Sequence, residues 1–372
     1  MMDDFYMNRA LQLAYRGIFT TDPNPNVGCV IVKNNHIVGE GWHRKAGDMH
    51  AEIYALINAG KNSLNATAYI TLEPCNHFGK TPPCCIELIK SGINRVVIAT
   101  KDPNPLVSGK SLTYLQKHGI QTKVGTMANE AKKINCGFFK RMKTGFPWIQ
   151  IKMASSIDGR TSLLSEKKCW ITDSFSRSDV QKFRAQSSAI LSSSATVMID
   201  NPSLNVRWNE LDTNTKVILK KEDVRQPIII IIDSKNKVTS QYKIINQSSN
   251  NIWFIRKNIK REFLSLKKIK QILVPTKNEN IDLLKMFLIL GKKQINKILV
   301  ESGPKLAGAL IKQKLADEII LYMSPKIFGH ENKELFYIPK LHKLSEALEY
   351  KFTDIQVLGN DLRLILTPKK NI

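Results

Sequence analysis

A short stretch of this chain contains three side chains of the kind that bind zinc. His50 is followed by Cys75 and Cys84, and Glu52 stands two residues after the histidine. Zinc prefers cysteine sulfur and histidine nitrogen in tetrahedral geometry, and a catalytic zinc keeps one of its four positions for water. The sequence therefore predicts a fold that brings His50, Cys75 and Cys84 together as three metal ligands, with Glu52 beside them.

The same residues predict catalysis. Bound zinc lowers the pKa of water, so that hydroxide is available near neutral pH. Glu52 would then transfer protons rather than bind the metal, and the order His-x-Glu followed by Pro-Cys is typical of nucleobase deaminases. The alternatives are that the three residues merely pack together or form a structural zinc site, but a structural site would be expected to have four protein ligands.

The alternation of apolar runs and turn residues predicts an α/β protein with two domains. Turn residues at Lys143–Pro147 precede a new strand, so we expect a first domain over residues 1–146 and a second over 147–372. In the first domain strands are expected at 27–32, 37–41, 68–72 and 95–100, and helices at 6–17, 51–59 and 84–90. In the second, strands are expected at 148–154, 228–233, 252–255, 298–301, 319–323 and 362–366, and helices at 176–185, 281–290 and 305–314.

The charge of the chain is strongly positive, with 56 Lys and Arg against 32 Asp and Glu and a formal net charge of +24. Such an excess can indicate nucleic-acid binding. Here the lysines are spread along the whole chain, without the clustered aromatic residues of a nucleic-acid surface. There is no signal-peptide pattern and no apolar run long enough to span a bilayer. We therefore expect a cytoplasmic protein with a small-molecule substrate and neither nucleic acid nor a membrane as partner.

The segments around the predicted metal ligands resemble the deaminase half of the bacterial bifunctional riboflavin-biosynthesis enzyme. These segments are Asn24–Gly28, His50–Glu52 and Thr71–Cys84, in which eight residues separate the two cysteines rather than two. The resemblance implies a cytidine-deaminase-like α/β/α layered domain. It also implies zinc-dependent hydrolytic deamination of 2,5-diamino-6-ribosylamino-4(3H)-pyrimidinone 5′-phosphate. The implied substrate contacts are Asn24, His43, His77 and Lys80, the last three near the phosphate.

The second half resembles the reductase domain of the same pathway, which is similar in fold to dihydrofolate reductase. The segments that carry this resemblance occur in the expected order, and they are 152–160, 170–172, 184–185, 196–204, 232–234 and 300–303. The resemblance implies NADPH-dependent reduction of the ribosyl group to ribityl, which gives 5-amino-6-ribitylaminouracil 5′-phosphate, and it suggests a homo-oligomer. No Gly-x-Gly-x-x-Gly motif follows the strands of this half, so a Rossmann domain has little support.

The resemblance also assigns residues of the reductase site. NADPH would bind Ala154, Trp170, Thr196, Asp200, Ser234 and the run Gly303, Pro304, Lys305, Leu306, Ala307 and Gly308. The substrate would contact Lys168, Arg184, Leu204, Arg207 and Glu301. Lys152 and Asp200 are candidates for assisting proton transfer. Arg184 and Arg207 suit a ribose 5′-phosphate through bidentate contacts.

Several alternatives stay open at this point. Lys168 would either reach the phosphate as a cation or point to solvent, and no residue decides between NADPH and NADH. The charge of +24 motivates an RNA-directed zinc deaminase with a basic RNA-binding C-terminal domain. The unusual turn at Ser165–Cys169 motivates a zinc-stabilised binding protein whose reductase half has decayed.

Overall fold

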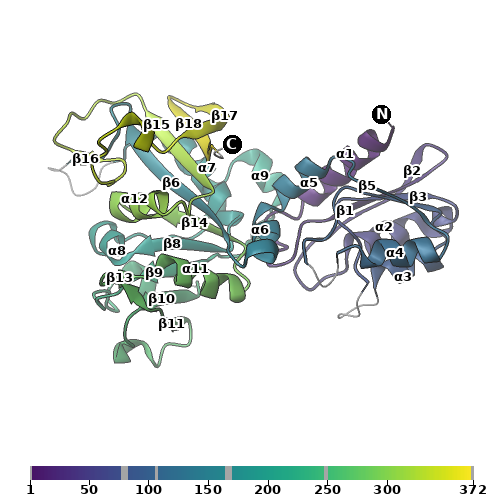
Figure 1. The fold of residues 1–372 in the computed structure, drawn as a ribbon, viewed down its shortest axis with the longest axis horizontal. Coiled ribbons are helices and arrows are strands. Elements are labelled where there is room, and N and C mark those ends of the chain that lie inside the picture. Colours follow the sequence, from purple (N-terminus) through teal and green to yellow (C-terminus); the bar gives the residue numbers. More distant parts are fainter. Residues whose placement is uncertain (1, 77–82, 105–107, 164–169, 247–249, 370–372) are drawn as a thin grey trace. The chain divides into compact units, whose positions relative to one another are not determined.

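The computed structural model describes residues 2–76, 83–104, 108–163, 170–246 and 250–369 (Figure 1). The chain divides into two compact units, Met1–Gly145 and Phe146–Ile372. Each unit has its own sheet and its own hydrophobic core, so each is described by itself. No helix in the described part of the chain is long and apolar enough to cross a membrane.

The first unit is a five-stranded sheet covered by helices on both faces (Figure 1). The strand order is β2-β1-β3-β4-β5, with β1 antiparallel to β2 and β3 and the other pairs parallel. The strands are β1 (Gly28–Lys33), β2 (His36–Trp42), β3 (Thr67–Ile70), β4 (Arg95–Ile98) and β5 (Gln121–Val124). The helices are α1 (Met2–Tyr15), α2 (Ala51–Ala59), α3 (Cys84–Lys90), α4 (Lys110–Lys117), α5 (Ala128–Ile134) and α6 (Cys136–Thr144).

Alternate residues of this sheet face two separate cores. Ile31 and Ile70 pack under α2, α3 and α4, whereas their neighbours Val30 and Tyr69 pack under α1 and α5. This alternation follows from the two-residue period of a strand, which sends successive side chains to opposite faces. The unit is therefore a three-layer α/β/α structure, as expected.

The second unit contains a nine-stranded sheet in the order β11-β10-β9-β8-β14-β6-β15-β18-β17. The seven strands from β11 to β15 are mutually parallel, and β18 and β17 add an antiparallel hairpin. The strands are β6 (Trp148–Ser156), β8 (Ala189–Ser193), β9 (Ile228–Ile232), β10 (Ile252–Arg256), β11 (Ile269–Leu273), β14 (Lys297–Glu301), β15 (Glu318–Ser324), β17 (Tyr350–Leu358) and β18 (Asp361–Pro368).

Helices and short strand pairs complete the second unit. The helices are α7 (Ser174–Ala185), α8 (Ser194–Asp200), α9 (Thr213–Ile218), α10 (Lys243–Asn246), α11 (Leu283–Lys292) and α12 (Pro304–Lys312). The short pairs are β7 (Arg160–Ser162) with β16 (Lys333–Glu334), and β12 (Thr276–Lys277) with β13 (Asn280–Ile281). Single 3-10 turns occur in the second unit at 208–210, 221–223, 261–263 and 344–346, and in the first unit at 60–63.

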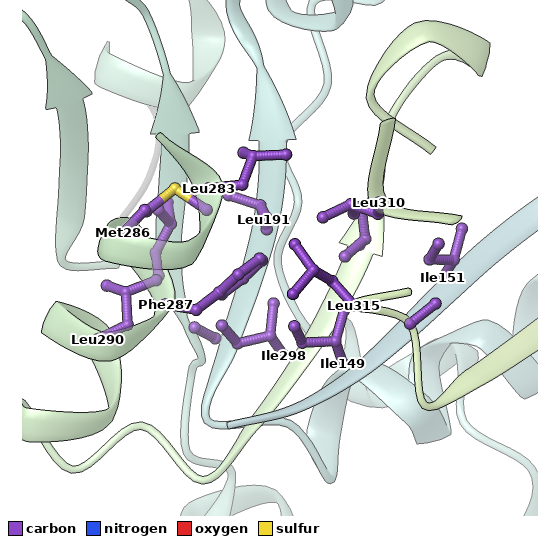
Figure 2. Packing of buried hydrophobic residues seen from close by; sticks show 14 of the residues in the cluster. Ile149, Ile151, Leu191, Leu283, Met286, Phe287, Leu290, Ile298, Leu310 and Leu315 are labelled. Carbon is purple, nitrogen blue, oxygen red and sulfur yellow. The ribbon is translucent and has the colours of Figure 1, made fainter. Parts of the chain in front are cut away.

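The core of the second unit lies between the parallel strands and helices α11 and α12. Phe287 of α11 and Leu310 of α12 pack against Ile149 of β6 and Ile298 of β14, and all four side chains are fully buried (Figure 2). Because both faces of a parallel sheet are covered, its strands are apolar without alternation, as Ile228–Ile232 shows.

The structure confirms most of the expected elements and corrects some boundaries. Helices α2 and α3 begin and end at the expected residues, and every expected strand is present. The helix expected to begin at Ile281 begins instead at Leu283, because Ile281 pairs in β13 and the Asp282 side chain caps the helix by accepting from the Lys285 N–H. The elements not expected from the sequence include β8, α8, β11 and β17.

Candidate functional site

The three predicted metal ligands lie together in the first unit. The ligand atoms of His50, Cys75 and Cys84 are all within 4.8 Å of one another. The His50 Nδ1 is 3.2 Å from the Cys84 Sγ and 3.6 Å from the Cys75 Sγ. A tetrahedral zinc ion bonded to both atom types would separate nitrogen from sulfur by about 3.6 Å. The arrangement therefore fits zinc, with the fourth position left for water.

Two helices present these ligands at their N-terminal ends. His50 directly precedes α2, and Cys84 is the first residue of α3. Cys75 lies between them, where its Sγ accepts a hydrogen bond from the Cys84 N–H at 3.3 Å. Cys85 turns the other way and is buried in the core beneath α3, as expected.

Glycines in β2 allow α2 to lie close enough to the sheet to position this site. A Cβ at Gly41 would lie 2.3 Å from the Ala51 carbonyl oxygen, and one at Gly39 would lie 2.3 Å from the Ala55 carbonyl oxygen. Both distances are far below van der Waals contact. Any side chain at these two positions would push away the helix that carries Glu52.

The pKa values of the ligand side chains depart strongly from their ordinary values. Hydrogen bonds from Cys84 and His50 hold the pKa of the Cys75 thiol well below its ordinary value. The Cys75 sulfur in turn raises the pKa of His50 to about 9. A thiolate and an imidazolium therefore face each other, and metal binding would release the imidazolium proton.

Glu52 is buried at the same place, with its side chain removed from solvent. Burial raises the pKa of its carboxyl group, against the opposing effect of His50. Glu52 is not among the three residues whose ligand atoms cluster, so it is not assigned as a fourth ligand. Its location suits a group that exchanges protons beside the metal.

Asn24 and His43 also lie at this site. The His43 ring is buried, and its centroid is 5.7 Å from that of His50. The His43 Nδ1 is 3.0 Å from the Met49 carbonyl oxygen, and its Nε2 is 3.2 Å from the Asn24 Nδ2. Burial lowers the pKa of His43, so a neutral ring can donate to Met49 and accept from Asn24. The two other residues expected to contact substrate, His77 and Lys80, lie outside the described residues.

Glu73 is a site-supporting residue that the motif analysis did not single out. Its buried carboxylate accepts hydrogen bonds from the Asp102 N–H at 3.1 Å, the Gly109 N–H at 3.0 Å and the Ser111 hydroxyl at 2.5 Å. It therefore fixes the loop before α4 to the segment that carries Cys75. The signal in the sequence was an acidic residue shortly after the apolar strand β3, two positions before Cys75.

The second unit holds a cluster of three expected site residues at the carboxyl end of its parallel strands. Arg184 of α7 binds Glu301 through two hydrogen bonds, Nε to Oε1 at 2.6 Å and Nη2 to Oε2 at 2.9 Å. Lys152 of β6 is the register partner of Glu301 in β14. Burial lowers the pKa of Lys152, while Arg184 and Lys152 together bring the pKa of Glu301 below its ordinary value despite its burial.

Arg184 has a further protein partner. Its Nη1 donates to the Asn205 carbonyl oxygen at 3.0 Å, so three of its five N–H groups bind protein atoms. The expected contact of Arg184 with the substrate phosphate stays a prediction. Arg207 is more open, although its Nε donates to Glu210 at 2.5 Å. Leu204 is buried with φ +47, a strained backbone for a branched residue.

The expected cofactor residues lie after several of the parallel strands. Gly303 caps α12 directly after β14, with Pro304 as the first helical residue and no side-chain cap. Among the described residues, no atom lies within 4 Å of the point where a Gly303 Cβ would stand. A ligand phosphate could therefore approach the free N–H groups of this nine-residue helix.

The other residues expected to bind the cofactor differ in how far they are exposed to solvent. Thr196 and Asp200 are four residues apart on α8 and share one face. Ser234 and Ala154 are partly exposed, Trp170 is 74% exposed, and Lys168 lies outside the described residues. Ala307 and Gly308 are buried, and a Cβ at Gly308 would lie 2.1 Å from the Tyr337 carbonyl oxygen. The glycine at 308 is thus required by packing, and this position is closed to a ligand.

Comparisons with known proteins cover both units. A family model described as the RibD C-terminal domain matches residues 147–364. A model described as the cytidine and deoxycytidylate deaminase zinc-binding region matches residues 1–100 and includes all three zinc ligands. Because the RibD C-terminal domain model occupies the C-terminal half, the alternative of an RNA-binding C-terminal domain is wrong.

Two of the similar proteins match this chain over nearly its full length. The riboflavin biosynthesis protein RibD of Escherichia coli (strain K12) is 50% identical over 367 residues, which are 98% of this chain and 99% of that protein. The solved structure of Acinetobacter baumannii RibD (form 1) is 38% identical with a TM-score of 0.92, covering 99% of both chains. A diaminohydroxyphosphoribosylamino-pyrimidine deaminase of Buchnera aphidicola subsp. Acyrthosiphon pisum is 68% identical over 147 residues, covering 40% of this chain and 100% of that protein.

The geometry of the ligand cluster leads to a direct test of metal binding. We expect Cys84→Ala to lose zinc, because two remaining protein ligands bind the ion far more weakly than three. Purified chains would be compared by elemental analysis, with about one zinc per chain expected for the unaltered protein. Cys85→Ala is the matched control and should keep its zinc, since that thiol faces the core. Stoichiometric zinc in the Cys84 variant would contradict the assignment.

Proposed function

The chain belongs to the RibD family of bifunctional riboflavin-biosynthesis enzymes, and we propose from this premise how its residues divide the two reactions. The family carries a pyrimidine deaminase activity and a ribosylaminouracil reductase activity. Its expected fold classes are confirmed: a cytidine-deaminase-like domain precedes a reductase domain of the dihydrofolate-reductase type. His50, Cys75 and Cys84 form the zinc-binding site of the deaminase.

We infer that residues 1–146 catalyse deamination and residues 147–372 catalyse reduction. The division of the chain into units at Gly145 and Phe146 supports this proposal. So does the similar Buchnera deaminase, whose whole length is covered by a match of 147 residues, 40% of this chain. Each reaction can therefore be assayed separately in the same purified protein.

The substrate of the first reaction would be 2,5-diamino-6-ribosylamino-4(3H)-pyrimidinone 5′-phosphate. Bound zinc supplies an acidified water molecule. The Glu52 carboxylate would accept the two protons of that water in turn and pass one to the ring nitrogen and one to the departing amino group. The amino group would leave as ammonia, and the ring carbon would gain a carbonyl oxygen. The single observation that carries this role is the burial of Glu52 beside three metal ligands that do not need it.

Substrate binding at this site would rely on polar groups around the ligands. Asn24 is hydrogen-bonded to the neutral His43 beside His50, so both side chains are held in fixed positions where substrate would bind. His77 and Lys80 are proposed near the phosphate, where the ammonium of Lys80 suits a dianion.

In the second reaction NADPH supplies a hydride to C1 of the open-chain or imine form of the ribose. We propose that Lys152 provides or relays the accompanying proton. Lys152 is half-buried and is the register partner of Glu301, whose carboxylate Arg184 holds in place by two hydrogen bonds. Asp200 is the second candidate, although its side chain is exposed on α8. Arg207 remains available for the substrate phosphate.

The cofactor would lie along the carboxyl edge of the parallel strands. The proposed contacts are Ala154, Trp170, Thr196, Asp200, Ser234, Gly303, Pro304, Lys305 and Leu306. The open space beside Gly303 and the uncapped start of α12 support a phosphate there. Ala307 and Gly308 would support this turn from behind rather than touch the cofactor.

We further propose a cytoplasmic homo-oligomer with no nucleic-acid partner. Strand β17 supports the oligomer, because it is the edge of the nine-stranded sheet and exposes Phe352, Ile355 and Val357. Long edge strands with exposed apolar side chains commonly pair with another chain.

The role of Glu52 can be separated from metal binding. We expect Glu52→Gln to keep its zinc but to lower the rate of ammonia release by about 10²–10⁴-fold, because the amide is no proton acceptor. Zinc content and ammonia release would be measured on the same preparation. Glu130→Gln, an exposed change at the start of α5, should leave both unchanged. Loss of zinc in the Glu52 variant would contradict the assignment.

The role of Lys152 can be tested in the second reaction alone. We expect Lys152→Met to slow NADPH oxidation with deaminated substrate by about 10²–10⁴-fold, because the proton donor is removed while the aliphatic stem is kept. Ammonia release should stay unchanged, since it occurs in the other unit. Lys297→Met, at the opposite end of β14, is the control. Equal reductase rates in both variants would exclude Lys152 from catalysis.

The oligomer proposal depends on the exposed edge of β17. We expect the unaltered protein to sediment as a dimer or larger species and Ile355→Asp to sediment as a monomer, because a charge on the apolar edge opposes pairing. Val217→Asp, an equally exposed apolar position on α9, should not change the assembly. A monomeric unaltered protein in analytical ultracentrifugation would refute the proposal.

A further inference from the structure

A loop of the first unit, residues 21–26, leads into β1 and carries Asn24, the substrate contact proposed above. The Asn24 Nδ2 is 3.2 Å from the Nε2 of His43, whose ring lies beside that of His50. The loop belongs to no helix or strand, and one turn bond runs within it from the Asn24 N–H to the Thr21 carbonyl oxygen at 2.8 Å. The position of Asn24 therefore depends on how the rest of the unit holds this loop.

Asn135 holds the loop from the far end of the first unit. Its Oδ1 accepts a hydrogen bond from the Asn26 N–H at 2.7 Å, and its Nδ2 donates to the Asn26 carbonyl oxygen at 2.8 Å. The two residues are 109 positions apart in the sequence. One side-chain amide thus satisfies both backbone polar groups of Asn26, which fixes the loop in place and in orientation.

The side chain of Asn26 adds to the same contact. Its Nδ2 donates to the Asn135 Oδ1 at 3.2 Å and to the Ile134 carbonyl oxygen at 3.5 Å. Its Oδ1 accepts from the Thr21 hydroxyl at 2.7 Å, and Thr21 and Asn135 are both buried. These bonds engage both amide atoms of Asn26 inside the unit. Asn26 therefore holds the loop, while Asn24, two residues earlier, reaches the site.

The place of Asn135 in its own helix shows that its side chain serves this loop. Asn135 is the N-cap residue of α6, where an asparagine side chain usually accepts from an N–H group of the first helical turn. Here it makes no such bond with α6. A helix without this cap is less stable, so the side chain is explained by its bonds to the loop and not by the helix.

A second contact joins α6 to the same loop. Arg141 of α6 is half-buried, and burial lowers its pKa, while the charge of Asp22 in the loop opposes that shift. The two charges therefore lie close enough to attract each other. Asp22 and Asn26 stand on either side of Asn24, so α6 and the residue that caps it hold the loop on both sides of the proposed substrate contact.

We propose that Asn135 positions Asn24 for the deamination reaction, by holding Asn26 and with it the loop 21–26. This proposal rests on the deaminase function and the substrate contact proposed above. The match to the deaminase zinc-binding region ends at residue 100, so Asn135 lies outside the part of the chain that carries the metal-binding motif. The working deaminase site thus includes the start of α6, near the end of the first unit.

Steady-state kinetics of ammonia release by the full-length protein would test this positioning. We expect Asn135→Ala to raise KM for the diaminopyrimidinone substrate about tenfold and to change kcat by less than about threefold, because a substrate contact that is held loosely binds less well. Zinc content and the reductase rate with deaminated substrate should stay unchanged. Asn58→Ala is the matched control and should leave KM unchanged, since it removes an asparagine bond to the Glu40 carbonyl oxygen elsewhere in the same unit.

A double-mutant cycle separates positioning from a general loss of structure. Asn24→Ala should raise KM about tenfold by itself. If Asn135 acts through Asn24, adding Asn135→Ala to Asn24→Ala should raise KM by less than about twofold more. A further rise of about tenfold in the double variant would overturn the proposal, because independent effects multiply.

A second variant serves if Asn135→Ala does not fold. Asn135→Asp has nearly the same shape and keeps an acceptor for the Asn26 N–H, but its carboxylate has no proton to donate to the Asn26 carbonyl oxygen. We expect its KM to be raised as well, and the rise to disappear when Asn24→Ala is already present. A KM equal to that of the unaltered protein would contradict the proposed contact.

The outcomes separate this proposal from the proposed function. An unchanged KM in both Asn135 variants, together with a raised KM in Asn24→Ala, would overturn the positioning role alone. An unchanged KM in Asn24→Ala would contradict the proposed substrate contact, and the positioning role with it. If the unaltered, zinc-loaded protein released no ammonia, the deaminase function itself would be wrong.

Discussion

The close packing of α2 against β2 is the constraint on which the first active site depends. Gly39 and Gly41 have no room for side chains, because the backbone of α2 occupies that space. The contact brings the start of α2, with His50 and Glu52, to the place where α3 begins with Cys84. Neither helix carries the whole site. Its chemistry arises only where the two N-terminal ends meet, and Cys75 completes it from the intervening segment.

The second unit obtains its site from a different constraint, the common direction of seven parallel strands. Their carboxyl ends share one edge, so Lys152, Glu301 and the turn after Ile232 lie near one another although they are far apart in sequence. Helix α12 starts at the same edge and leaves its first N–H groups without a side-chain cap. One topological property thus accounts for both the proposed proton-transfer cluster and the proposed phosphate-binding end.

The sequence allowed prediction of those features that depend on residues close together along the chain. The zinc ligands were predictable because their chemistry and spacing are specific, and α2 and α3 were predictable because Gly60 and Pro83 mark their boundaries. Strand β17 was not, because all nine of its residues are exposed or half-exposed and a register shift between Phe352 and Asp354 interrupts the alternation of its side chains. The bond between Arg184 and Glu301 could not be anticipated either. It joins residues 117 positions apart and depends on how α7 meets β14.

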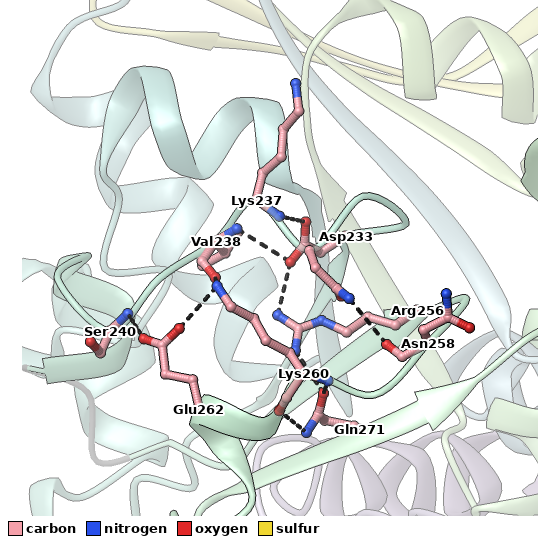
Figure 3. Close-up of polar contacts among 10 residues, drawn as sticks. Asp233, Lys237, Val238, Ser240, Arg256, Asn258, Lys260, Glu262 and Gln271 are labelled. Atoms are coloured by element: carbon pink, nitrogen blue, oxygen red, sulfur yellow. Dashed lines mark hydrogen bonds and ion pairs between the residues drawn. The ribbon is translucent and has the colours of Figure 1, made fainter.

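Two of the buried ion pairs in the described part of the second unit are better explained by positioning than by stability. Removing charges from water costs free energy that a buried pair regains only with good geometry and further hydrogen bonds. Arg184–Glu301 and Asp233–Arg256 both have those bonds, as Figure 3 shows for the second pair, and both stand at the edge where ligands are expected to bind. Apolar residues could have filled either place at lower cost. Apolar residues could not hold a carboxylate beside Lys152 or bind the backbone N–H of Lys237. The charged pairs are therefore explained by the orientation that they give to these groups.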